Sequence, residues 1–169
     1  MRAIVYTSNT GHTAAYAQLL GKETGLPVYS AQEAKQQLAK GTPILYLGWL
    51  MAGSVKGYRK AAKRYQIAAV CGVGLCATGA LLEEVRKGNA IPAGTPLFTL
   101  QGGMDHARLR GLYKSMINTL TRFMAKKKDR SADEDEMLRL LGTDGNYVSE
   151  ANLNAVLAWY AEMRDVEHR

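Results

Sequence analysis

The sequence predicts a doubly wound α/β domain, in which helices cover both faces of a parallel sheet. Five short apolar segments, rich in β-branched and aromatic residues, alternate with segments of helical periodicity. Parallel strands need crossover connections, and these connections pack on the sheet as helices. The 169 residues fit one domain. We expect a single domain over residues 1–169, with a core over 1–128 and a helical tail over 129–169.

Glycine, proline or small polar residues bound each predicted element. The predicted strands cover residues 4–6, 28–30, 43–47, 67–71 and 96–100. The first four are followed by predicted helices over residues 14–21, 30–40, 56–64 and 80–87. Ser30 and Glu33 have the spacing of a capping box, which marks the start of the second helix. The third strand is continuously apolar, as is typical of a strand buried on both faces.

The chain after the fifth strand is predicted to be helical, without a long insertion around that strand. Apolar residues recur at helical spacing over residues 109–124, and lysines at 126–128 suit the end of that helix. We expect this stripe to cover the sheet. The alternative is that the basic amphipathic helix rests on an anionic membrane. Ser131 and Glu134 form a second capping box, and the spacing over residues 153–160 marks a last helix.

Net charge and composition limit the partners that we expect. The formal net charge is +7, and its basic surplus lies in residues 1–104. No nucleic-acid-binding motif accompanies this charge, so we expect no nucleic-acid partner. No apolar run approaches the roughly 18–20 residues of a membrane span. The N-terminal residues enter a predicted strand directly rather than a signal peptide, which predicts a cytoplasmic protein, with a peripheral membrane location as the alternative.

Two cysteines, Cys71 and Cys76, lie in an apolar stretch. Their spacing, without a nearby histidine or second pair, is not that of a zinc site. We expect two thiols in the core and no metal, and a redox-active pair is the alternative.

The most informative segment is the polar loop between the first strand and the first helix. Its residues are Ser8, Asn9, Thr10, Gly11, His12 and Thr13. Backbone N–H groups at the start of a helix point outwards with the positive end of the helix dipole behind them, and hydroxyl and amide side chains add neutral donors. This pattern predicts a phosphate site, and capping of the helix by the same side chains is the alternative. The loop lacks the patterns of triphosphate and dinucleotide loops.

The run from Ile4 to Thr13 resembles the FMN-phosphate loop of flavodoxins, commonly S/T-x-T-G-x-T after a hydrophobic strand. The resemblance implies FMN as the cofactor, a flavodoxin-like sheet of order 2-1-3-4-5, and two further loops around the flavin ring, at residues 48–54 and 72–76. The ring-binding residues that it implies are Trp49, Leu50, Met51, Ala52, Gly53, Val73, Gly74 and Leu75. Trp49 either stacks on the ring or packs in the core, and His12 either donates to the phosphate or faces water.

The segment over residues 100–106 and the helix after it are similar to the flavodoxin-domain proteins grouped with menaquinone-dependent protoporphyrinogen oxidase. This similarity implies dehydrogenation of a protoporphyrinogen-type substrate, with a quinone as acceptor, as one candidate reaction. Asp105 and His106 suggest proton transfer to or from a substrate. We expect Asp105 instead to cap the long helix.

These observations lead to two hypotheses from different classes. The first is an FMN-dependent oxidoreductase or electron carrier, whose partner is a redox protein, a small-molecule substrate, a quinone or a membrane surface. The second is a flavin-free flavodoxin-like scaffold that binds partners through its basic surface.

Overall fold

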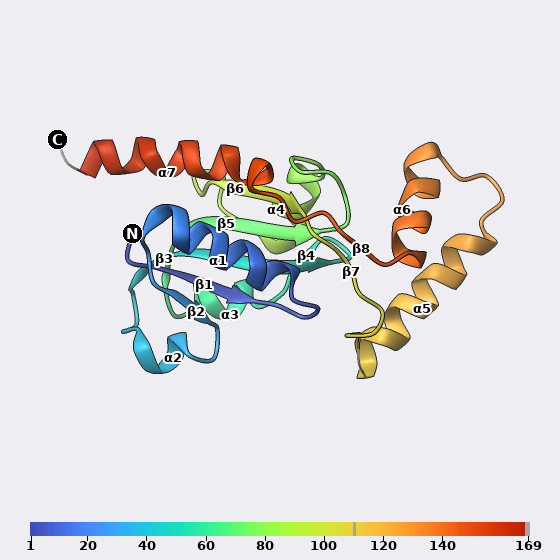
Figure 1. The fold of residues 1–169 in the computed structure, drawn as a ribbon, viewed down its shortest axis with the longest axis horizontal. Coiled ribbons are helices and arrows are strands. Elements are labelled where there is room, and N and C mark those ends of the chain that lie inside the picture. The colour runs from blue at the N-terminus through green and yellow to red at the C-terminus, as the bar shows by residue number, and fades with distance from the viewer. Residues whose placement is uncertain (110, 168–169) are drawn as a thin grey trace.

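The computed structural model describes residues 1–109 and 111–167 (Figure 1). Its main sheet contains five parallel strands in the order β2-β1-β3-β5-β6. These strands are β1 (Ala3–Thr7), β2 (Val28–Ser30), β3 (Pro43–Met51), β5 (Gln66–Gly74) and β6 (Leu97–Gln101). A short strand, β4 (Ser54–Val55), pairs antiparallel with the end of β3. The α/β class is confirmed, and the main strands follow the expected flavodoxin-like order.

Helices cover both faces of this sheet because successive strand residues point to opposite sides. The helices that pack on it early in the chain are α1 (His12–Thr24), α2 (Ala34–Gln37), α3 (Tyr58–Ala62) and α4 (Leu82–Asn89). Ile4 and Leu45 are buried in the cluster that contains α1. Their neighbours Val5 and Ile44 are buried in the cluster that contains α2, α3 and α4. This alternation produces two cores, one on each face.

The second and third helices are shorter than predicted. The capping box forms, since the Ser30 N–H donates to Glu33 Oε2 at 2.8 Å and the Glu33 N–H donates to Ser30 Oγ at 3.2 Å. The helix nevertheless ends at Gln37, because Leu38 is extended and packs against the core instead of continuing towards residue 40. α3 likewise covers only part of the predicted range 56–64.

The last helix of the chain completes the sheet's covering. A 3₁₀ helix, η1 (Glu150–Leu153), leads into α7 (Asn154–Glu167), which contacts α1. Leu153 and Val156 are fully buried in the same cluster as α1. The rings of Phe98, on β6, and Trp159, on α7, lie with their centroids 6.0 Å apart. Within the helical tail, η1 and α7 therefore cover the β6 side of the sheet.

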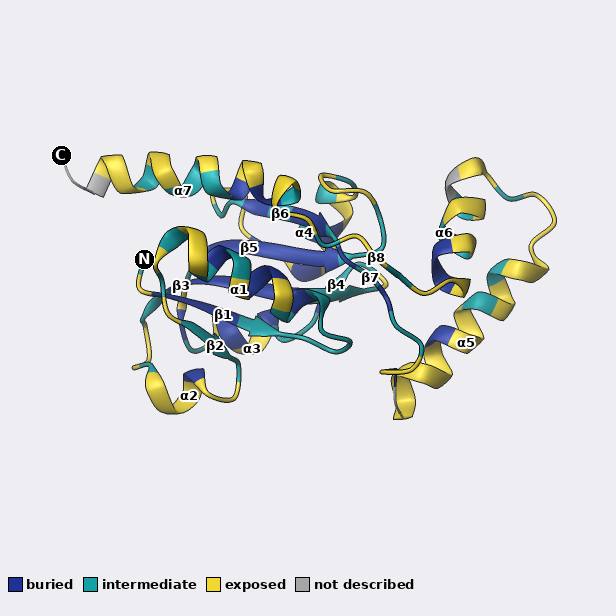
Figure 2. Cartoon of the chain, in the orientation of Figure 1, coloured by how far each residue is buried: buried dark blue, intermediate teal, exposed yellow. Residues whose placement is uncertain are grey.

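The predicted helix over residues 109–124 forms as α5 (Gly111–Lys126), but the expectation that it covers the sheet is wrong. α5 packs against α6 (Ala132–Gly142), and Figure 2 shows both helices largely exposed, beyond the carboxyl ends of the strands. Among the described residues of α5, only Ile117 is buried. The reason is that α7 already occupies the face that α5 was expected to cover.

Residues 105–144, which we call the excursion, leave and rejoin the core through one short antiparallel pair. This pair consists of β7 (Gly103–Met104) and β8 (Gly145–Asn146). The fifth main strand, β6, is itself uninterrupted, and the two helices predicted after it form the excursion. The capping box at the start of α6 is confirmed, since the Glu134 N–H donates to Ser131 Oγ at 3.2 Å and the Ser131 N–H donates to Glu134 Oε2 at 3.0 Å.

Candidate functional site

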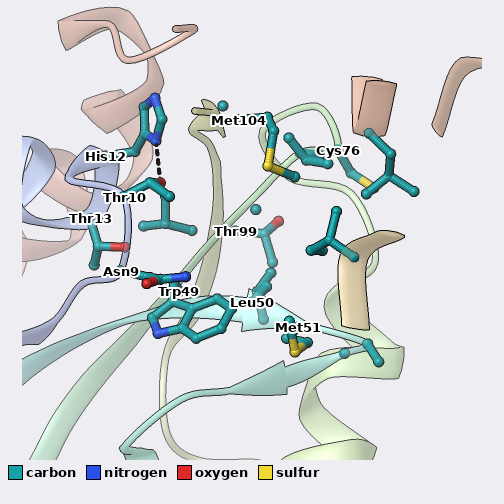
Figure 3. A pocket seen from close by; sticks show the side chains of 18 of the residues that line it. Asn9, Thr10, His12, Thr13, Trp49, Leu50, Met51, Cys76, Thr99 and Met104 are labelled. Carbon is teal, nitrogen blue, oxygen red and sulfur yellow. Dashed lines mark hydrogen bonds between the residues drawn. The ribbon is translucent and has the colours of Figure 1, made fainter. Parts of the chain in front are cut away.

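A cavity with a volume of about 440 Å³ opens at the carboxyl edge of the sheet (Figure 3). It lies beside the ends of β1, β3 and β5, where sheets of this type bind ligands. All of the predicted cofactor-binding residues except Ser8 and Gly11 line it. These lining residues are Asn9, Thr10, His12, Thr13, Trp49, Leu50, Met51, Ala52, Gly53, Val73, Gly74 and Leu75. Three segments that are distant in the sequence therefore meet in one cavity.

The loop after β1 is held by its own side chains. Ser8 Oγ accepts a hydrogen bond from the Gly11 N–H at 3.2 Å, and Thr10 Oγ1 lies 3.0 Å from His12 Nδ1. Gly11 precedes α1 with a φ of 107°, in the region that favours glycine. Among the described residues, no side chain caps α1. The first N–H groups of α1 are therefore left for water or a ligand, which favours the phosphate hypothesis over the capping alternative.

The ring of His12 connects this loop to β8. Nδ1 lies 3.0 Å from Thr10 Oγ1, and the ring also hydrogen-bonds to the Gly145 backbone. Burial lowers the pKa of His12 below its ordinary value of 6.5, an effect that Asp105 opposes and Arg108 reinforces. Near neutral pH His12 is therefore an uncharged hydrogen-bonding group. Any positive charge at this loop has to come from another residue.

The two segments expected to be loops around the ring are strands over most of their length. β3 continues to Met51 and β5 to Gly74, so residues 48–51 and 72–74 are strand residues. This differs from the prediction because Trp49 pairs in register with Val73, and because the hairpin with β4 extends β3. Ala52 and Gly53 form the hairpin turn, with φ values of 46° and 73°.

Strand geometry gives the cavity a rigid apolar side. The side chain of Leu50 lies over Gly72 and Gly74, where a Cβ would approach its atoms to 3.1 Å. Trp49 is half-buried and packs edge to face with Tyr113 of α5, with ring centroids 4.8 Å apart. Lys56 Nζ lies 5.8 Å from the centroid of the Trp49 ring. Trp49 thus contacts the excursion as well as the cavity.

The excursion supplies a wall of the cavity that sequence reasoning missed. The residues of this wall are Leu109, Met116, Ile117, Leu120, Met137 and Leu141. Leu109, Ile117 and Leu141 form a separate buried cluster with Met104, against which Met51 and Leu75 pack. The apolar stripe was visible in the sequence, but its spacing does not indicate which surface the stripe meets.

Arg108 was also missed as a site residue. Its Nη1 donates to the Thr10 carbonyl at 3.2 Å, and its Nε lies 3.2 Å from Asp105 Oδ2. A Cβ at Gly11 would lie 2.8 Å from Nη1, so the glycine leaves room for the guanidinium. Because Arg108 lies 98 residues from Thr10 along the chain, no local motif could connect the two.

Asp105 and His106 form hydrogen bonds with other residues of the excursion. Asp105 Oδ1 accepts from the Arg108 N–H at 3.1 Å, so it caps a turn before α5 and not the long helix itself. His106 Nδ1 lies 2.5 Å from Asp144 Oδ1, and its Nε2 lies 2.9 Å from the Leu141 carbonyl. His106 lowers the pKa of Asp144 through hydrogen bonds to the carboxylate from its backbone and its ring. Neither Asp105 nor His106 lines the cavity, which disfavours proton transfer to a ligand there.

No disulfide joins Cys71 and Cys76 in this structure. Cys71 is fully buried, and burial raises the pKa of its thiol, which makes it a poor nucleophile. Cys76 is half-buried, lines the cavity and is not bonded to Cys71. Within residues 1–109 and 111–167, no group of three or more His, Cys, Asp or Glu side chains could hold a metal ion.

No protein-family model, curated protein or solved structure matches this chain. The interpretation of the site therefore depends on its geometry.

Proposed function

We propose that this protein binds FMN in the cavity at the carboxyl edge of the sheet and acts as a flavin-dependent redox protein. The observation that supports the proposal most directly is the meeting of three segments in one cavity. The loop after β1 has the residues and helix N-terminus suited to a phosphate, and the ends of β3 and β5 provide an apolar surface beside it.

The residues present fit the chemistry of this cofactor. A flavin ring is flat and largely apolar, and the cavity is lined mainly by aliphatic, methionine and aromatic side chains. Its volume of about 440 Å³ falls within the range of roughly 300–1,000 Å³ that is usual for small-molecule sites. The loop offers hydroxyl, amide and backbone N–H donors without a lysine, which suits a ligand that stays bound.

Each part of the cavity has a distinct role in this proposal. Residues 8–13 hold the phosphate, and Arg108 adds a positive charge behind them. Trp49, Val73 and Leu75 position the ring and exclude water together with the α5 and α6 wall. When bound, the flavin supplies reversible electron transfer, and the protein contributes position and electrostatics. The described site contains no buried carboxylate that would act as a proton donor or acceptor.

Whether a protoporphyrinogen-type substrate and a quinone acceptor belong to this site stays a prediction from the resemblance. Rapid reduction of the bound flavin by that substrate, followed by reoxidation with a quinone, would support it. Absence of both reactions would remove this candidate while leaving FMN binding intact.

The proposal is tested by titrating flavin-free protein with FMN while following the quenching of flavin fluorescence. The test variant is Thr10→Ala with Thr13→Ala, and the matched control is Thr42→Ala with Thr95→Ala, two threonines that do not line the cavity. Thr13 is buried, so thermal unfolding of both variants is measured in parallel. We expect tight binding by the wild type and the control, and weak binding by a folded test variant. No binding by the wild type would refute the proposal and leave the flavin-free scaffold as the better account.

A further inference from the structure

α5 presents an apolar surface that is largely uncovered, apart from the contact of Tyr113 with Trp49. Leu112 and Phe123 are 73% and 74% exposed, and Tyr113, Met116 and Leu120 are exposed beside them. Residues 112, 116, 120 and 123 follow the spacing of one helix face, so their side chains form a continuous stripe. Figure 2 shows this helix beyond the carboxyl ends of the strands and largely exposed. We call this surface the α5 stripe.

The charges around the α5 stripe have one sign. α5 contains Lys114, Arg122 and Lys126 but no aspartate or glutamate, and two further lysines follow it. The described residues that follow α5 in the excursion pair with one another in three ion pairs. These are Lys127 with Glu134, Arg130 with Asp135, and Arg139 with Glu136. Lys114, Arg122 and Lys126 form no ion pair with any side chain that the structure describes. Helical spacing places Arg122 and Lys126 beside the stripe, on the flank away from Ile117.

A second hollow, with a volume of about 500 Å³, lies at the C-terminal end of the stripe. Its lining combines apolar and basic side chains with a single acid. The lining residues are Phe123, Met124, Lys126, Lys127, Arg130 and Glu134. Lys127 and Arg130 are already paired with Glu134 and Asp135, which leaves Lys126 as the cation of this hollow without a described acidic partner. Lys126 beside the exposed Phe123 matches the chemistry of a lipid, whose anionic headgroup lies next to apolar chains.

The stripe also borders the proposed cofactor site. Met116 and Leu120 belong to the stripe and line the main cavity as well. Whatever covers the stripe therefore lies at the rim of that cavity. In residues 1–109 and 111–167, no helix has the length and apolar character needed to cross a bilayer.

We propose that α5 docks this protein on the surface of an anionic lipid bilayer. The α5 stripe lies among the upper acyl chains, and Arg122, Lys126 and the basic hollow contact the headgroups. A second copy of the chain fits less well as the occupant, because α5 contains no aspartate or glutamate that could pair with the Lys114, Arg122 and Lys126 of another α5. The proposal does not depend on FMN binding.

The test is co-flotation of the purified full-length protein with lipid vesicles. One set contains phosphatidylcholine alone, and the other contains about one-third phosphatidylglycerol in place of it. We expect binding to the anionic vesicles only, weakened as sodium chloride rises from about 0.1 to 0.5 M. Leu112→Ser with Phe123→Ser should reduce the bound fraction at least about tenfold, because it removes the two most exposed apolar side chains of the stripe. Val166→Ser, at a site 74% exposed on α7, is the matched control and should bind as the wild type does.

A second pair of variants isolates the charge. Arg122→Gln with Lys126→Gln should weaken partitioning at least about tenfold, whereas Lys60→Gln with Lys63→Gln, which removes the same charge elsewhere, should have little effect. All four altered residues are exposed, so the fold should be unchanged, and this is checked by thermal unfolding. Equal partitioning of the wild type and both α5 variants would overturn the proposal. So would a concentration-dependent dimer that forms without lipid and is abolished by Leu112→Ser with Phe123→Ser, because a second copy would then be the occupant.

Discussion

Arg108 offers a direct test of how the excursion contributes to the proposed phosphate site. The guanidinium donates to the Thr10 carbonyl at 3.2 Å and is the one cation that contacts this loop among the described residues, since burial keeps His12 neutral. Replacing Arg108 with glutamine keeps a hydrogen-bonding side chain and removes the charge. We expect Arg108→Gln to weaken the binding of FMN and to leave the binding of riboflavin, which lacks the phosphate, unchanged.

The size of this effect follows from the exposure of the side chain. Because 68% of the Arg108 side chain is exposed, the range for exposed ion pairs applies, about 0.2–1 kcal/mol for each pair of charges. The phosphate of FMN carries about two negative charges near neutral pH. We therefore expect a loss of about 1 kcal/mol, which is about a fivefold rise in Kd.

Fluorescence titrations of FMN and riboflavin measure this difference, at low salt and at higher salt. Asp105→Asn is the matched control, because it breaks the same ion pair but keeps the arginine charge and removes a nearby negative one. This control should bind FMN as tightly as the wild type or more tightly. An equal loss for FMN and riboflavin would leave the ratio of the two affinities unchanged and would refute the electrostatic reasoning, because Arg108 would then act on the shape of the site.

Three further predictions concern the core, the loop histidine and the base of the excursion. Leu153→Ala should lower the free energy of unfolding by about 2–5 kcal/mol, because this side chain of η1 is fully buried in the same cluster as α1. Phe123→Ala should change the free energy of unfolding by less than about 0.5 kcal/mol, because that side chain is 74% exposed. Urea unfolding compares the two variants, and a larger loss for Phe123→Ala would contradict the positions of α5 and α7. Folding lowers the pKa of His12 below 6.5, so the unfolded chain binds more protons than the folded chain once the pH falls below 6.5. The stability that comes from keeping His12 neutral is therefore complete above pH 6.5 and is lost as the pH falls through the folded pKa. The urea midpoint of the wild type should therefore fall more between about pH 7.5 and 5.5 than the midpoint of His12→Gln, which has no ionisable side chain at this position. An identical fall in both proteins would contradict the lowered pKa of His12. Asp144→Asn removes the carboxylate that holds the His106 ring and should accelerate amide hydrogen exchange in α6 more than in α1, a difference absent if the excursion is held by packing alone.

The sheet could be predicted because its signals are local. Apolar runs bounded by glycine and proline identify five main strands, and the parallel arrangement follows from the helices between them. The loop over residues 8–13 was identified for the same reason, since its position between a strand and a helix follows from its immediate neighbours. The strand ends were less accurate, because the extension of β3 to Met51 depends on pairing with β4 and β5.

The covering of the sheet could not be predicted, because two amphipathic helices compete for one face. The stripes over residues 109–124 and 153–160 both have the spacing of a helix that covers a sheet, and the earlier one was assigned to this role. The structure gives the role to α7, since Phe98 and Trp159 pack together and Leu153 and Val156 are fully buried. The pairing of Met104 with Gly145 closes the base of the excursion, and it joins two short segments that have no strand signal of their own. Arg108 reaches the loop only as a result of that pairing.

This arrangement predicts that the excursion can be removed without unfolding the core. Met104 and Gly145 are paired neighbours, so residues 105–144 can be replaced by a two-residue Asn-Gly turn that closes a hairpin between β7 and β8. The two buried clusters of the sheet contain no residue of this segment, whereas the third cluster consists mainly of its side chains. We expect the shortened chain to keep cooperative unfolding and the amide protection of α1 and α7.

The same deletion should separate the proposed activities from the fold. It removes Arg108, the α5 and α6 wall of the cavity and the α5 stripe, so FMN should bind more weakly and lipid binding should be lost. Hydrogen exchange, FMN titration and vesicle flotation on one preparation measure the three properties together. Loss of amide protection in α1 of the shortened chain would show that the excursion is part of the folding core. A folded shortened chain that still floats with anionic vesicles would place the lipid contact on the basic surface of residues 1–104, because no other strongly basic part of the chain remains.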